Sequence, residues 1–464
     1  MPQAVKKYFD ENLTAGLQNF LTASNTSDAV GKVMNIGQAL REAGLMQESL
    51  MCFGKAIELQ PKEPHVWRML AGTLYFMGQW KLNLRAQKMF YDLEHAESAS
   101  ERKQTELRYL PWESYTVAIG HMTYLDAIAK RKMLGWQPPY KLVLLAPPNR
   151  VANRCYLEYW RPYLDGIITD PAEIESISPL DEKLRERHNF MSLSNGQSLY
   201  YKSAIAKIEE KWEADGRAPL LTLSESDCDR GFETLKKMGV PPDAWFVGLH
   251  VREDNHSWRV ARNADINNYQ LAMRSVAERG GWVIRMGDRY MKPLPPMKNV
   301  IDYVHSDYKS DWMDVFLWAK ARFYLGTNSG PVVVPTTFGV PCINTNLVPL
   351  GNRGSSSRDT FVPKLVWSQN KSRYLTFSEM LDSPSGWSEV PQYLTQNGYI
   401  LHENTAEDIN EAVLEMFEKT ENSFKLAEED QHLQEKFKKL EKTHQMLGRN
   451  KIGRMFLRKY ASLL

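Results

Sequence analysis

The sequence predicts an α/β protein in which an all-α segment precedes two Rossmann-like domains. Residues 30–63 align with residues 64–97 at a period of 34, the period of a repeating helical hairpin. From residue 115, and again from residue 244, short apolar runs alternate with amphipathic stretches, which is typical of a parallel sheet covered by helices. These observations predict three domains, at residues 1–105, 106–235 and 236–464.

The composition is that of a multidomain protein with balanced charge. At 464 residues, 43% of them hydrophobic and 25% charged, the chain is long enough for two or three cores. It carries 58 basic and 56 acidic residues, a net charge of +2, so we expect no nucleic-acid partner. Its four cysteines form no CxxC pair and no 18-residue apolar run occurs, which favours the cytoplasm over export or membrane spanning.

The helical segment matches the tetratricopeptide pattern of apolar, small and turn positions. Gly44 and Gly78 fall in register at the turns of the two copies, where glycine relieves the backbone. The second copy has polar Asn83 and Gln87 at expected packing positions, so it is degenerate or a cap. Two functions stay open: a groove that binds a protein partner, or hairpins that only pack on the next domain. The matching positions in the first copy are Val33, Ile36, Gly37, Leu40, Gly44, Phe53, Ala56 and Pro61.

The two α/β series are read from apolar runs that end in glycine, proline or polar residues. In the first series we expect strands at 115–121, 141–148 and 166–170 and helices at 122–135 and 152–164. In the second we expect strands at 244–251, 282–287, 299–304, 322–327 and 341–346 and helices at 267–280, 310–321 and 330–339. This order predicts a doubly wound sheet, and the two domains are expected to face each other across a cleft.

The carboxyl ends of parallel strands are where such folds bind ligands, so residues directly after each strand are the candidates. His250, Arg252 and Asp254 alternate as one strand ends, so their side chains can point to the same side. Arg252 can bind a phosphate in a bidentate manner, with its orientation fixed by Asp254. The alternative is an arginine and an aspartate that pair with each other and close the strand end.

A second strand end reads "LGTNSGP" and runs directly into a predicted helix. Free backbone N–H groups and the positive end of a helix dipole make such a turn an anion site, and Pro331 suits the first helical turn. The candidate residues are Thr327, Asn328, Ser329 and Gly330. The alternative is an ordinary capped turn.

Three further strand-end residues are weaker candidates. Asp288 follows Gly287 and suits either a sugar contact or a turn. Asn346 suits a hydroxyl or base edge, with loop-closing hydrogen bonds as the alternative. His121, at the expected opposite wall of the cleft, is a candidate general base for an acceptor hydroxyl because histidine titrates near neutral pH, although a structural role is the alternative.

No group of residues predicts a catalytic metal or a bound cofactor. Asp227 and Asp229 have the DxD spacing that can hold a metal-bound sugar nucleotide. They precede a helical segment, however, so we interpret them as an N-cap region.

An ordered series of motifs resembles a bacterial family of GT-B glycosyltransferases that is often fused to tetratricopeptide repeats and associated with surface carbohydrate synthesis. The series covers about 115 to 420 and is strongest from 244 to 350. It comprises "GLHVRED", "RNADINNY", "GGWVIRMGD", "VIDYVHSDYKSDWMDVFLWAKARFYLGTNSG", "FGVPCINTNLVPLG", "LTFSEML" and "ENTAEDINEAVLEM". The element His250, Val251, Arg252 is also similar to the HxR signature of fucosyltransferases that use GDP-fucose, although the spacing after it differs.

The resemblance implies a GT-B-like pair of domains and a metal-independent transferase that uses a nucleotide sugar as co-substrate. It implies that Arg252 contacts the donor diphosphate, that "TNSG" receives nucleotide phosphate, and that Arg262 and Asn263 belong to the "RNAD" element beside the donor. We expect catalytic roles for Arg252, Asp254 and His121. The acceptor is a glycan, a lipid-linked sugar or a protein.

A non-catalytic alternative is an assembly protein in which the repeats recruit a partner and the glycosyltransferase part is degenerate. The C-terminal stretch 447–464 mixes basic and apolar residues and has two interpretations. It is either an amphipathic helix that rests on the inner face of a membrane, or a last helix that packs back on the domains.

Overall fold

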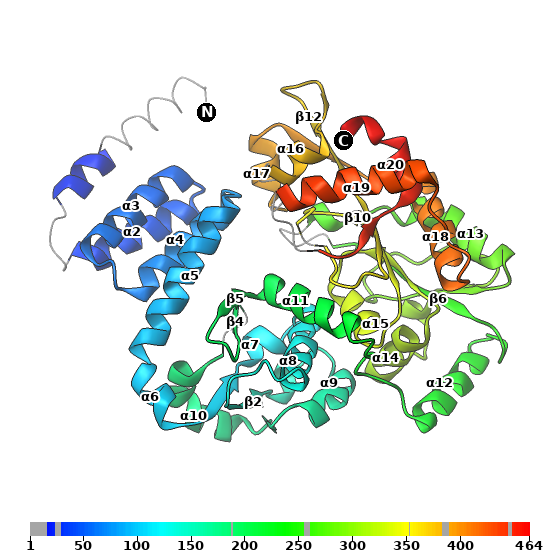
Figure 1. The fold of residues 1–464 in the computed structure, drawn as a ribbon, viewed down its shortest axis with the longest axis horizontal. Helices are drawn as coiled ribbons and strands as arrows, with labels where there is room; N and C mark the ends of the chain where they lie inside the picture. The colour runs from blue at the N-terminus through cyan, green and yellow to red at the C-terminus, as the bar shows by residue number, and fades with distance from the viewer. Residues whose placement is uncertain are drawn as a thin grey trace. The chain divides into compact units, whose positions relative to one another are not determined.

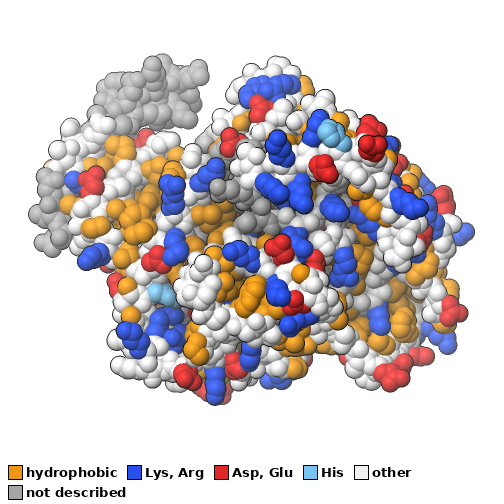
Figure 2. Space-filling model, in the orientation of Figure 1, with side chains coloured by type: hydrophobic (Ala, Val, Ile, Leu, Met, Phe, Trp, Pro, Cys, Tyr) orange, Lys and Arg blue, Asp and Glu red, His pale blue; other side chains and the backbone are white. Residues whose placement is uncertain are grey.

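We describe the protein from a computed structural model, which defines residues 16–23, 29–186, 189–254, 260–351, 353–382, 389–443 and 448–464 (Figure 1). The chain forms two compact units, Met1–Gln104 and Thr105–Leu464. Acidic and basic side chains are interspersed over the face seen in Figure 2, as the near-zero net charge leads one to expect.

The first unit is built from helical hairpins. Helices α2 (Val30–Glu42) and α3 (Met46–Leu59) form one hairpin, α4 (Pro64–Phe76) and α5 (Trp80–Glu97) the next, and α6 (Ala99–Gln104) follows. Corresponding helices start 34 residues apart, so the predicted period is present in the structure. Their assignment to the tetratricopeptide class stays a prediction.

Two features explain how these hairpins pack. Gly44 and Gly78 have φ of +80° and +67° at the two interhelical turns, a backbone conformation that glycine adopts without strain. The polar residue Asn83 is 1% exposed and donates its side-chain N–H to the Ala71 carbonyl at 2.6 Å. Its polarity is therefore satisfied inside the hairpin, which explains an asparagine at a packing position.

The second unit begins with a three-stranded parallel sheet of β1 (Leu107–Leu110), β2 (Lys141–Leu145) and β3 (Gly166–Ile168), in that order. Along the chain, α8 (Thr123–Met133) comes between β1 and β2, and α9 (Arg154–Trp160) comes between β2 and β3, as predicted. The remainder of this first lobe, residues 105–224, contains α10 (Pro171–Leu184), a hairpin of β4 (Phe190–Ser192) and β5 (Ser198–Tyr200), and α11 (Tyr201–Ala214). Helix α12 (Glu225–Lys237) follows and packs on α14 (Asp311–Lys320).

The strand predicted at 115–121 is wrong. That stretch holds the end of α7 (Trp112–Tyr115) and the 3-10 helix η2 (Ile119–Met122), while the first strand lies earlier, at β1. The N–H groups of Thr116 and Val117 both donate to the Trp112 carbonyl at 3.0 Å, which curls the chain. The apolar run was misleading because Val117 is 40% exposed. His121 therefore lies in η2 and not at a strand end.

The second lobe, residues 241–464, holds a seven-stranded parallel sheet. Its order is β15-β11-β10-β9-β6-β7-β8. From β6 to β11 this is the 3-2-1-4-5-6 order of a doubly wound sheet, so that prediction is confirmed. The strands are β6 (Phe246–His250), β7 (Trp282–Arg285), β8 (Val300–Ile301), β9 (Tyr324–Thr327), β10 (Cys342–Leu347), β11 (Thr360–Pro363) and β15 (Lys451–Ile452); the helices include α13 (Gln270–Glu278), α14 (Asp311–Lys320), α15 (Val333–Thr337) and α18 (Ala406–Thr420).

The last part of the chain closes the second lobe. An antiparallel sheet of β12 (Leu365–Ser368), β13 (Arg373–Tyr374) and β14 (Tyr399–His402) was not predicted, nor were the short helices α16 (Phe377–Asp382) and α17 (Pro391–Gln396). Helices α19 (Glu428–Thr443) and α20 (Arg454–Lys459) pack against each other, and α20 also packs on α18.

Residues 448–464 follow the second interpretation of the C-terminal stretch, a last segment that packs back on the domains, and contact with a membrane stays a prediction. The apolar side chains of Phe456 and Leu457 are 3% and 1% exposed. The basic side chains pair with acids of α18 and α19, because Arg454 binds Glu418, Arg458 binds Asp430 and Lys459 binds Asp408. The segment therefore packs back on its own lobe. No helix among the described residues is long and apolar enough to cross a bilayer.

The two lobes of the second unit share one hydrophobic core on one side. Helix α8 lies against α15 and helix α9 lies against α14 (Figure 1). Buried side chains from both lobes form a single cluster. Tyr156 and Thr337 join their hydroxyls at 2.8 Å, and Asn153 donates to the Asp311 carbonyl at 2.9 Å. The predicted cleft is therefore closed along this side.

Candidate functional site

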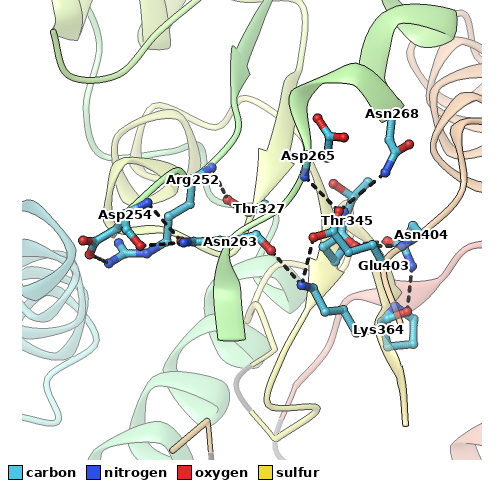
Figure 3. Close-up of polar contacts among 12 residues, drawn as sticks. Arg252, Asp254, Asn263, Asp265, Asn268, Thr327, Thr345, Lys364, Glu403 and Asn404 are labelled. Carbon is cyan, nitrogen blue, oxygen red and sulfur yellow. Dashed lines mark hydrogen bonds and ion pairs between the residues drawn. The ribbon is translucent and has the colours of Figure 1, made fainter. Parts of the chain in front are cut away.

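The carboxyl ends of β6 and β9 are the most promising position for a ligand site. The chain proceeds from β6 to β7 and β8 on one side of the sheet, then returns to β9 and continues to β10 and β11 on the other. The strand order reverses between β6 and β9, and open α/β sheets bind ligands in the crevice at this reversal. Arg252 follows β6 and Thr327 ends β9, and the Arg252 N–H donates to Thr327 Oγ1 at 3.1 Å (Figure 3).

A glycine allows the two strands to approach at this point. A Cβ atom placed on Gly326 would lie 1.9 Å from the His250 carbonyl oxygen, closer than any side chain can come. The two predicted motifs therefore meet because position 326 has no side chain.

The Arg252 guanidinium forms an ion pair with Asp254, and the two side chains are 18% and 19% exposed. Arg252 Nε is buried and has no hydrogen-bond partner in the part of the chain that the structure describes. The ion pair between Arg252 and Asp254 is expected if Asp254 orients Arg252 for a phosphate, and it is also expected if the two residues only close the strand end. The contact therefore does not distinguish the two interpretations. The Arg252 side chain is partly exposed at the end of β6.

The "RNAD" element fastens the segment that follows β6. Asn263 donates its amide to the Asp254 carbonyl at 2.6 Å and accepts the Asp254 N–H at 3.3 Å, while the Ala264 N–H donates to the Arg252 carbonyl at 3.2 Å. Both amide atoms of Asn263 thus bind the backbone of Asp254 (Figure 3), and its role as a donor ligand stays a prediction.

Arg262 also differs from its predicted role. Its guanidinium binds the carboxylate of Glu389, with Nη2 at 2.6 Å from Oε1 and Nε on Oε2. Glu389 is 2% exposed. A bidentate pair of this kind occupies the face of the guanidinium that a diphosphate would need.

His250 is buried inside the sheet and does not reach a ligand. Its imidazole is 3% exposed, with Nδ1 at 3.2 Å from the Met286 carbonyl oxygen, and no described residue lies within hydrogen-bonding distance of Nε2. Burial lowers the pKa of His250 to about 4. The imidazole is therefore neutral at physiological pH, and it is a core residue and not the donor ligand that was predicted.

The turn after β9 is more enclosed than predicted. The Ser329 N–H donates to the Thr327 carbonyl at 2.8 Å, so it is not free for an anion. Asn328 donates its side-chain N–H to the Val348 carbonyl at 2.8 Å, and Asn328 and Ser329 are 7% and 6% exposed. The helix that follows, α15, has five residues and is preceded by a 3-10 turn, so it supplies a weaker dipole than predicted.

The first lobe covers this turn. A Cβ atom on Gly330 would lie 2.9 Å from Ile119 Cγ2, and one on Gly120 would lie 3.1 Å from the Gly330 Cα. The structure therefore places the segment that carries His121 against the turn after β9. This segment is a 3-10 helix and not the predicted strand end. The His121 side chain is half-buried.

Two other predicted residues have local roles. Asn346 has φ of +52° and is fully buried, and it exchanges hydrogen bonds with Asn404, so the loop-closing alternative holds for this residue. Asp288 is exposed after β7, and its carbonyl accepts the Met291 N–H at 3.0 Å in a turn. Asp288 is thus outside the core, in the loop after the strand that pairs with β6.

A buried lysine near the site was missed by the sequence analysis. Lys364 Nζ donates to the Asn263 carbonyl at 2.7 Å and lies 3.6 Å from Glu403, whose other oxygen accepts the Asp265 N–H at 2.8 Å (Figure 3). Burial lowers the pKa of Lys364. A lysine inside the apolar run "FVPKLVW" was the available signal, because buried lysines need a partner.

The DxD pair lies in the first turns of α12, next to the predicted N-cap region. Ser224 caps α12 and Asp227 stands three residues later, where it accepts hydrogen bonds from the hydroxyls of Tyr159 and Ser224, each at 2.8 Å. Within the described residues, no group of three His, Cys, Asp or Glu side chains is placed to hold a metal ion.

No family model and no curated protein matches the chain. Among solved structures, it is similar to the glycosyl transferase family 9 protein from Veillonella parvula DSM 2008, with 10% identity and a TM-score of 0.34 over 51% of this chain and 79% of that one. It is also similar to the iron-containing dodecameric glycosyltransferase TibC from enterotoxigenic E. coli H10407, with 14% identity and a TM-score of 0.30 over 52% of this chain and 58% of that one. Both similarities are distant.

Proposed function

We propose that the chain is a glycosyltransferase that moves a sugar from a nucleotide-diphosphate donor, such as a GDP-sugar, to a glycan, lipid-linked or protein acceptor in bacterial surface carbohydrate synthesis. One observation carries the proposal: the hydrogen bond from the Arg252 N–H to Thr327 Oγ1 at 3.1 Å. It joins the loops after β6 and β9 at the strand-order reversal, where sheets of this order bind nucleotides. Both loops carry motifs of the glycosyltransferase resemblance.

In this proposal, Arg252 stabilises the diphosphate that leaves as the glycosyl bond breaks. Asp254 holds the guanidinium, so little reorganisation is needed when negative charge develops. The positive charge that stabilises the leaving diphosphate comes from the Arg252 guanidinium, so the proposed transfer needs no metal. His121, on the segment that lies against Gly330, is the proposed base for the acceptor hydroxyl.

A thermal-shift panel of UDP, GDP, ADP and CMP tests the proposal, because a ligand that binds only the folded state raises the melting temperature. We expect one diphosphate to raise the melting temperature of the parent and to have a smaller effect on Arg252→Ala. No shift with any of the four nucleotides would contradict the proposal.

A second candidate function is a non-catalytic assembly protein that recruits a partner through the helical repeats. The observation that favours it is the cover of Gly330 by Ile119 and Gly120, which leaves little room for a diphosphate at the turn. Saturable nucleotide binding with neither transfer nor hydrolysis of a nucleotide sugar would support this candidate. Turnover of a nucleotide sugar would exclude it.

A further inference from the structure

A solvent-exposed tyrosine stands beside the candidate site, on the loop after β7. Tyr290 is 66% exposed, more than any other large apolar side chain in the described part of the chain. Strand β7 pairs with β6 in parallel, so the loops after both strands leave the sheet at the same edge. Arg252 and Tyr290 therefore belong to neighbouring loops at the ligand-binding end of the sheet.

The turn that carries Tyr290 is fixed on both sides of its tip. The Met291 N–H donates to the Asp288 carbonyl at 3.0 Å, and the Met291 carbonyl lies 2.9 Å from His305 Nε2. The Met291 side chain is 2% exposed, so it anchors the turn in the core. An exposed aromatic ring on an anchored turn loses little conformational freedom when a ligand stacks on it.

A direct hydrogen bond ties this turn to the Arg252 segment. Glu253 accepts the Lys292 N–H at 3.0 Å, which holds the residue after Arg252 against the end of the tyrosine turn. Partial burial, together with the carboxylates of Asp288 and Asp254, raises the pKa of Tyr290. The phenol thus lies in the electrostatic neighbourhood of the Arg252 pair and stays neutral at physiological pH.

We propose that the Tyr290 ring is the surface on which the nucleobase of the donor stacks. The inference rests on the proposed function, and it assigns to one residue the recognition of the part of the donor farthest from the transferred sugar. A base has an aromatic face that stacks on tyrosine, whereas a bare pyrophosphate has none. Tyr290 is therefore expected to contribute to nucleotide affinity and not to pyrophosphate affinity.

The experiment measures calorimetric dissociation constants of the full chain for its preferred nucleoside diphosphate and for inorganic pyrophosphate. Tyr290→Ala is expected to weaken nucleotide binding roughly 5- to 150-fold, the range for loss of one base–aromatic stack, and to leave pyrophosphate binding unchanged. Tyr290→Phe keeps the ring and is expected to bind like the parent. Tyr308→Ala, which removes a 38% exposed tyrosine bonded to the Lys237 carbonyl, is the matched control.

Three outcomes would overturn the inference, and they are distinguishable. If the parent binds a nucleotide and Tyr290→Ala binds it equally well, the stacking role is wrong and the proposed function stands. If the parent binds none of the nucleotides, the proposed function fails and the inference fails with it. Equal weakening of pyrophosphate and nucleotide by Tyr290→Ala also contradicts stacking, because it would mean a disturbed phosphate site.

Discussion

Asn346 and Asn404 each donate a backbone N–H to the side-chain oxygen of the other, at 2.5 and 2.8 Å. The two residues are 0% and 2% exposed, and Asn404 also donates its amide to the Pro363 carbonyl at 2.8 Å. This reciprocal pair joins the end of β10 to the loop between β14 and α18. Asn346, which was predicted to contact a ligand, therefore has a structural role.

Asn346→Ala is therefore expected to lower the stability of the protein and to leave nucleotide binding unchanged. It leaves a buried N–H without an acceptor and places alanine at φ of +52°, for a total loss of about 2–5 kcal/mol in the free energy of unfolding. Urea denaturation measures the loss. Asn422→Ala is the control, since Asn422 has a similar φ of +57° but is exposed, so only the smaller backbone cost of about 1 kcal/mol remains. Equal losses for both variants would contradict the role of the pair.

Arg252→Ala is expected to weaken binding of the preferred nucleotide about 10- to 150-fold, because a hydrogen bond to a charged group contributes about 1.5–3 kcal/mol. Its melting temperature should stay close to that of the parent, since the Arg252–Asp254 pair is partly exposed. Arg373→Ala, which breaks an exposed pair with Glu379, controls for the loss of one positive charge. If Arg252→Ala binds the nucleotide as tightly as the parent, Arg252 is not part of the binding site.

His250 is expected to make stability depend on pH. Because burial lowers its folded-state pKa to about 4, the unfolded chain binds the proton more readily between about pH 6.5 and 4. The contribution of His250 is complete above pH 6.5 and is lost as the pH falls through this window, by about 3 kcal/mol.

His250→Gln tests this dependence, because glutamine can keep a hydrogen bond to the Met286 carbonyl and does not titrate. The difference in unfolding free energy between parent and variant should change by about 3 kcal/mol in favour of the variant from pH 6.5 to pH 4. Taking the difference removes the effects of other titrating groups. A pH-independent difference would mean that His250 is not a buried neutral histidine.

Gly326→Ala is expected to disrupt the site and the sheet together. The new Cβ would meet the His250 carbonyl oxygen at 1.9 Å, and β6 and β9 must separate to admit it. We expect a loss of at least about 3 kcal/mol and of nucleotide binding, measured by denaturation and calorimetry. Gly54→Ala in α3, where nothing lies within 4 Å of the added Cβ, should be neutral or stabilising by up to about 1 kcal/mol. A stable, binding-competent Gly326→Ala would disprove the close approach.

Much of the fold was predictable because it depends on short-range patterns. The runs that became β6, β7 and β9 are apolar and end in glycine or polar residues, and the turns at Gly44 and Gly78 need glycine. Prediction failed at 115–121, where hydrogen bonds from two successive N–H groups to the Trp112 carbonyl overrode an apolar run. It also failed at β12 to β14, where long-range antiparallel pairing forms the sheet.

The sequence by itself determined the helical period, the doubly wound order and the strand-end position of Arg252, because these follow from spacing and polarity along the chain. Only the tertiary structure decided which of the predicted polar residues have partners inside the protein. Arg262 turned to Glu389, Asn346 to Asn404 and the Ser329 N–H to the Thr327 carbonyl. The physical reason is that a buried polar group takes whichever partner the fold places nearest, and that partner is distant in sequence for Arg262 and Asn346.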